Sequence, residues 1–116
     1  MTFSLYVDTE RWRTHADSVR AAVEGLVPVA KGNGYGFGGA LLAAEAQRLD
    51  CDTMAVGQPD EVSLVHDSFL GDVLVLTPWH PITDPTPPPD DRLVLTVAHP
   101  EAIRALQGTS TRVVVE

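Results

Sequence analysis

The sequence predicts an α/β fold with a parallel sheet, and three observations support this prediction. Short apolar runs recur about every twenty residues, with carboxyl ends near residues 31, 56, 76, 97 and 115. Helical patterns fill most of the intervals between them. Such alternation is typical of parallel strands that are joined by right-handed crossovers. The pattern fits either an open doubly wound sheet or part of a closed (β/α)₈ barrel.

The first elements are predicted from an apolar run and an amphipathic stripe. Residues 3–7 are expected to form a strand, and Asp8 or Thr9 is expected to cap the helix that follows. The stripe of this helix has the spacing i, i+4, i+7, i+11 and consists of Trp12, Ala16, Val19 and Val23. Gly25 is expected to end the helix.

The remaining elements continue the alternation. Residues 26–31 are expected to form a strand that is buried on both sides, because its apolar residues are continuous, although Pro28 lacks one donor. Further strands are predicted at 53–56, 73–76, 93–97 and 112–115. Helices are predicted at 40–49, 59–66 and 100–106, and the last should face inward with Ile103 and Leu106. Residues 77–91 include six prolines and should form a loop.

Composition restricts the class of partner. The chain has 116 residues, which is enough for one domain, and a formal net charge of −8. This charge argues against nucleic acid and anionic membranes as partners, because Lys and Arg dominate phosphate binding. The sequence has no transmembrane run and no signal-peptide pattern, and Cys51 is its only cysteine, so we expect a cytoplasmic protein with that residue buried. The four histidines lack ligand spacing, so no metal site is expected.

The most distinctive stretch places the only lysine of the chain at the end of a predicted strand. Lys31 is followed by five glycines, at positions 32, 34, 36, 38 and 39. Glycines let a ligand approach the backbone closely, so the stretch predicts a site for an amine nucleophile and an anionic cofactor. Gly34, Gly36 and Gly39 also fit a dinucleotide-binding turn, but the next strand ends without the acidic residue that would hold a ribose. A plain strand-to-helix turn with no ligand is the third interpretation.

This stretch resembles the lysine motif of the alanine racemase family, which is usually written V-x-K-A-N/D-A-Y-G-H-G. The residues that coincide are Lys31, Asn33, Tyr35, Gly36 and Gly38. The segments 6–8 and 54–56, and Glu61 after them, resemble the neighbouring parts of the family, so the resemblance covers essentially the whole chain. Glycines 32 and 34 replace the usual alanines, Phe37 replaces a histidine, and an arginine that commonly follows the glutamate is absent.

The resemblance implies that residues 1–116 are the N-terminal portion of a (β/α)₈ barrel that binds pyridoxal 5′-phosphate (PLP), with about five barrel strands. It implies a PLP-dependent amino-acid racemase in which Lys31 forms the internal aldimine and is one of two acid/base groups. Tyr35 would contact the cofactor phosphate, or else be an ordinary packing residue. Asn33 is expected to be a turn residue.

The family's opposing base, most of its phosphate site and its C-terminal domain would lie beyond Glu116. We therefore expect the chain alone to be inactive and to associate through open sheet edges, whereas the full-length form should be a homodimer. The departures from the motif leave the identity of the amino-acid substrate open.

Two alternatives from other classes also remain open. The first is a non-catalytic barrel protein that uses the same lysine to handle PLP. The second is an isolated structural domain with no ligand. In either PLP-binding case, Lys31 is expected to be partly desolvated at the strand end, because only the neutral amine attacks a carbonyl.

Overall fold

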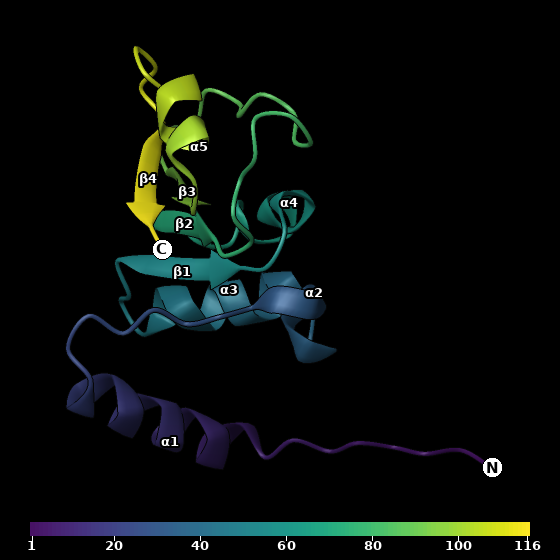
Figure 1. Ribbon diagram of the computed structural model, residues 1–116. Coiled ribbons are helices and arrows are strands. Elements are labelled where there is room, and N and C mark those ends of the chain that lie inside the picture. The colour runs from purple at the N-terminus through teal and green to yellow at the C-terminus, as the bar shows by residue number, and fades with distance from the viewer.

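The computed structural model describes residues 1–116 and shows a small sheet with helices packed beside it (Figure 1). Three helices come first, namely α1 (Thr9–Ala22), α2 (Lys31–Tyr35) and α3 (Gly39–Arg48). Strand β1 (Thr53–Val56) then leads through the 3₁₀ turn η1 (Pro59–Glu61) into α4 (Val62–Val65). The last elements are β2 (Asp72–Val75), β3 (Leu93–Val97), α5 (Pro100–Ala105) and β4 (Arg112–Val115).

The four strands are parallel and lie side by side in the order β1-β2-β3-β4. The segment before α2 adds a fifth position, because Val29 forms a parallel bridge with Ala55 of β1. Two hydrogen bonds of 2.8 Å fix this bridge, from the N–H of Ala30 to the carbonyl of Ala55 and from the N–H of Ala55 to the carbonyl of Pro28. Spatial order therefore equals sequence order, without the reversal of a doubly wound sheet, as in an arc of a barrel.

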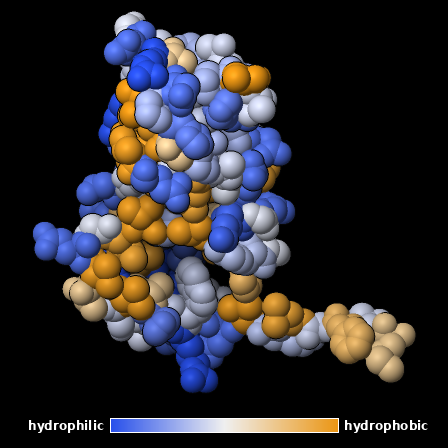
Figure 2. All heavy atoms as spheres, viewed as in Figure 1, coloured by the Kyte–Doolittle hydropathy of each residue, from blue (hydrophilic) through white to orange (hydrophobic).

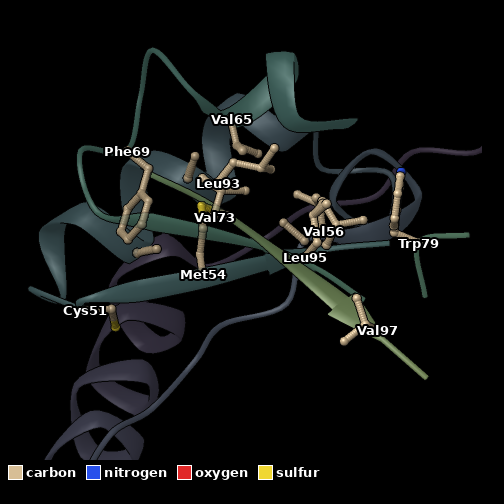
Figure 3. Packing of buried hydrophobic residues seen from close by; sticks show 14 of the residues in the cluster. Cys51, Met54, Val56, Val65, Phe69, Val73, Trp79, Leu93, Leu95 and Val97 are labelled. Atoms are coloured by element: carbon tan, nitrogen blue, oxygen red, sulfur yellow. The ribbon is translucent and has the colours of Figure 1, made fainter. Parts of the chain in front are cut away.

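The core lies on one face of this sheet. Met54, Val73 and Leu93 are aligned across β1, β2 and β3, and all three are buried. Figure 3 shows Met54 and Val73 in the same cluster as Val65 of α4. The cluster also contains Ala43 and Ala46 of α3 and Ala102 of α5. The helices therefore cover the same face, as right-handed crossovers between sequentially ordered parallel strands require.

The elements from α3 onward agree closely with the sequence predictions. Strands β1, β3 and β4 have the predicted bounds, β2 begins one residue earlier than predicted, and residues 77–91 contain neither helix nor strand. One inward-facing residue of α5 was predicted wrongly. Leu106 is buried, but Ile103 is 42% exposed, because the turn of α5 directs the small side chain of Ala102 at the sheet instead.

Two predictions on the N-terminal side are wrong. Residues 3–7 form no strand and make no backbone hydrogen bond, and Phe3, Leu5 and Tyr6 are each at least 82% exposed. Figures 1 and 2 show this largely hydrophobic tail projecting from the body. A strand needs a hydrogen-bonded neighbour, and this run has none. The predicted strand at 26–31 is reduced to its bridge at Val29, and Lys31 begins α2 instead of ending a strand.

Helix α1 is attached to the body mainly through polar contacts, since none of its residues is fully buried. Glu45 of α3 is buried, and its Oε1 accepts a hydrogen bond of 3.0 Å from Nε of Arg13 in α1. Its Oε2 accepts one of 2.7 Å from Nε of Arg48, whose guanidinium also lies 2.8 Å from Asp17 of α1. The hydrogen bond from Arg13 is the main reason that the pKa of Glu45 is lowered from its ordinary value. Glu45 is thus the centre of the α1–α3 contact.

We expect Glu45→Gln to loosen α1 and to lower the free energy of unfolding by about 1–2 kcal/mol at neutral pH. Because the folded-state pKa is depressed, the ionised carboxylate stabilises the fold above the ordinary value of 4.5. That contribution is lost as the pH falls through the depressed pKa of Glu45 in the folded state. The difference in free energy of unfolding between the variant and the parent should therefore shrink in acid. Urea unfolding at several pH values measures it. Glu24→Gln, at an exposed residue, is the control, and an equal loss there would contradict the assignment.

Candidate functional site

Lys31 lies at the edge of the sheet where the carboxyl ends of the strands meet. A cavity of about 670 Å³ at this edge is lined by Lys31 and Tyr35 of α2, by Gly57 and Glu61 after β1, and by Thr77 after β2. Lys31 is the only cation in this lining. In barrels and in open α/β sheets alike, ligands bind at the carboxyl edge of the parallel strands. The lysine that the sequence singled out is therefore at the edge where a site is expected.

The turn that carries Lys31 to this edge is left-handed. Its φ angles are 62° at Gly32, 51° at Asn33, 68° at Gly34 and 56° at Tyr35. Residues with a Cβ are strained in this region, and glycine at two of the four positions removes part of the strain. Asn33 tolerates the region better than most residues, and its Oδ1 accepts a hydrogen bond of 3.0 Å from the N–H of Gly39. Asn33 is therefore a turn residue that ties the turn to the start of α3.

The two predicted site residues are brought to one cavity, and both are accessible. Tyr35 is 59% exposed, which is unlike a residue of the packed core. Lys31 is exposed as well, so the partial burial that we expected for its amine is not found. The strand that was expected to bury it ends at the bridge of Val29, before the lysine.

Glu61 is the residue of this site that sequence reasoning missed, since it served there only as part of the family resemblance. A Cβ placed on Gly57 would lie 3.1 Å from Oε1 of Glu61 and 3.1 Å from Cβ of Lys31, so both side chains lie beside this glycine. Oε1 accepts a hydrogen bond of 3.1 Å from the N–H of Gln58, which closes the turn η1. Oε2 is buried and has no hydrogen-bond partner. Only the fold of the loop after β1 reveals this neighbourhood.

Other reactive groups of the chain lie elsewhere. Cys51 is buried before the amino end of β1, as expected, and burial raises the pKa of its thiol. No group of three or more His, Cys, Asp or Glu side chains is arranged to hold a metal ion. None of the helices has the length and apolar character to cross a membrane.

Comparison with known families shows to which family the chain belongs. The profile described as "Alanine racemase, N-terminal domain" matches residues 7–115. The chain belongs to this family. The match spans the lysine motif and every strand, so the resemblance is confirmed, and the parallel sheet is part of the N-terminal barrel of the alanine racemase family. Members of this family depend on PLP, which leaves the dinucleotide interpretation without support. A comparison with curated proteins gave no match.

In the left-handed turn, replacing Gly34 by alanine should destabilise the fold more than replacing Gly32 does. At Gly34 a Cβ would lie 3.2 Å both from the backbone nitrogen of Gly39 and from Cδ1 of Leu42, whereas at Gly32 it would meet nothing within 4 Å. Both glycines have positive φ, so Gly34→Ala and Gly32→Ala share a strain of about 1 kcal/mol. We expect Gly34→Ala to lower the free energy of unfolding by about 1 kcal/mol more than Gly32→Ala does, as measured by urea unfolding. Equal losses would show that the turn does not pack against α3.

Proposed function

We propose that this chain is the PLP-binding part of an amino-acid racemase, and that Lys31 is the residue that binds the cofactor. One observation carries the proposal: the only lysine of a chain from a PLP-dependent family lines a cavity at the carboxyl edge of the sheet, together with Tyr35. The volume of about 670 Å³ is within the usual range for small-molecule sites.

The residues at this edge fit PLP in their chemistry. Lys31 supplies an accessible primary amine for the aldehyde. Gly57 leaves open the space over which Lys31 approaches, since a Cβ there would lie only 3.1 Å from the lysine side chain. Tyr35 is exposed in the same cavity, and its hydroxyl is a suitable donor to an anionic oxygen.

The roles of the chain's own groups follow from this arrangement. When bound, PLP supplies an electron sink that stabilises negative charge at the α-carbon of an amino acid. Nζ of Lys31 would hold the cofactor and would move a proton at the α-carbon of the substrate. The hydroxyl of Tyr35 would donate a hydrogen bond to the phosphate and so orient the cofactor. Racemisation needs a proton-carrying group on each face of the α-carbon, and Lys31 serves one face.

Activity and assembly are part of the same proposal. With Lys31 serving only one face, the 116-residue chain alone is proposed to be inactive. All four residues of β4 are exposed at the edge of the sheet, and an unpaired edge strand favours association. The full-length protein is proposed to be a homodimer that acts on an amino acid.

A second candidate function is PLP binding without catalysis. The exposure of Lys31 favours it, because an open cavity does not exclude water from a reacting centre. A racemisation assay on the full-length protein distinguishes the two, since both candidates bind PLP through Lys31 but only one interconverts amino-acid enantiomers.

The cofactor assignment predicts a single labelling site. Because Lys31 is the only lysine, borohydride reduction of the chain with PLP should attach the phosphopyridoxyl group there, as read by peptide mass spectrometry. Lys31→Ala should abolish that label. Label confined to the α-amino group of Met1 would contradict the assignment.

The role of Tyr35 predicts weaker binding without its hydroxyl. Tyr35→Phe removes one hydrogen bond to a charged group and should reduce PLP affinity by about 1.5–3 kcal/mol, or roughly ten- to a hundredfold. Fluorescence or absorbance titration measures the affinity. Tyr6→Phe is the matched control, because Tyr6 is the only other tyrosine and lies 89% exposed in the tail. Equal affinity in both variants would contradict the contact between Tyr35 and the phosphate.

A further inference from the structure

One buried side-chain polar atom in the structure has no hydrogen-bond partner, and it belongs to a residue that lines the Lys31 cavity. This atom is Oε2 of Glu61. Its companion Oε1 is held by the N–H of Gln58 at 3.1 Å, so the carboxylate cannot turn away without losing that bond. A buried acceptor without a donor is costly, and more so when it carries charge. Glu61 is therefore a fixed acceptor that requires a donor.

Lys31 is the donor that its position and charge favour. Cβ of Lys31 and Oε1 of Glu61 each lie 3.1 Å from the place of a Cβ on Gly57, so they are separated by no more than twice that distance. That separation is within reach of the flexible lysine side chain. Tyr35 and Glu116 are the other titratable groups of the cavity lining, and neither is a cation. Lys31 makes no ion pair in the structure, so its amine is free to take up this role.

We propose that Glu61 is a positioning residue for Lys31, with Oε2 accepting a hydrogen bond from Nζ and holding the amine over Gly57. This hydrogen bond directs the amine into the cavity, so that its position is set before a carbonyl arrives. The catalytic meaning of this pair rests on the proposed function. The pair itself forms without PLP and can be measured without it.

Two substitutions isolate the charge of Glu61. Glu61→Gln keeps an oxygen that can accept the N–H of Gln58 but removes the negative charge from the cavity. Asp60→Asn makes the same change in net charge one residue earlier in η1, where the side chain is exposed and does not line the cavity. An effect of net charge alone would be the same in both variants.

Acetylation with acetic anhydride over a range of pH is the direct test on the full chain. Lys31 and the α-amino group of Met1 are the only amines, so peptide mass spectrometry follows one test site and one internal reference. At each pH, Lys31 should be acetylated about three- to tenfold faster in Glu61→Gln than in the parent, because the hydrogen bond that holds its amine is weaker there. Met1 should be unaffected, and Asp60→Asn should match the parent. Equal Lys31 rates in Glu61→Gln and Asp60→Asn would overturn the proposal.

A thermal double-mutant cycle excludes an indirect effect through η1. Lys31→Met should lower the melting temperature in the parent background and change it much less in the Glu61→Gln background, because the pair is already broken there. The same decrease in both backgrounds would overturn the pairing. Neither measurement uses PLP, so a coupled pair in a chain that takes no PLP label would refute the proposed function and leave the pairing intact.

Discussion

The left-handed turn at residues 32–35 is the constraint on which the site depends. It lies shortly after the bridge between Val29 and Ala55, which fixes the preceding segment against β1. It lies shortly before α3, to which the side chain of Asn33 ties it by a hydrogen bond of 3.0 Å. With both ends held, the direction of the chain between them determines where Lys31 and Tyr35 lie. A right-handed turn of the same length would place these side chains differently relative to the sheet edge.

The sheet determines where this turn lies in the fold. Because the parallel strands are in sequence order, the helices that connect them share one face, and the loops after the strands gather at one edge. The helix-covered face contains the buried side chains, so the hydrophobic core and the candidate site lie in different parts of the fold. The residues around Lys31 are accessible at the edge, where backbone and small side chains leave a cavity.

Much of the fold could be predicted from the sequence because the strands β1, β3 and β4 are short apolar runs between clear turn residues. The wrong predictions have one physical origin. The periodicity of a segment shows which structure it can form, but not whether other parts of the fold lie beside it. Residues 3–7 have a strand-like pattern but no partner for hydrogen bonds, and Ile103 has helical spacing but is exposed, whereas its neighbour Ala102 is buried. For the site, the sequence motif was enough to identify Lys31 and Tyr35. The buried Oε2 of Glu61, which has no hydrogen-bond partner, could not be predicted, because its position depends on the path of the loop after β1.

The central claim is that the carboxyl edge beside Lys31 is a PLP site. Titration of the ¹⁵N-labelled chain with PLP, followed by the chemical shifts of its backbone amides, tests this claim most directly. The account predicts changes concentrated at Gly32, Gly57 and Thr77, which line the cavity from three different segments. Changes concentrated at the opposite edge, at Gly71 before β2 and Asp91 before β3, or no changes at all, would contradict it.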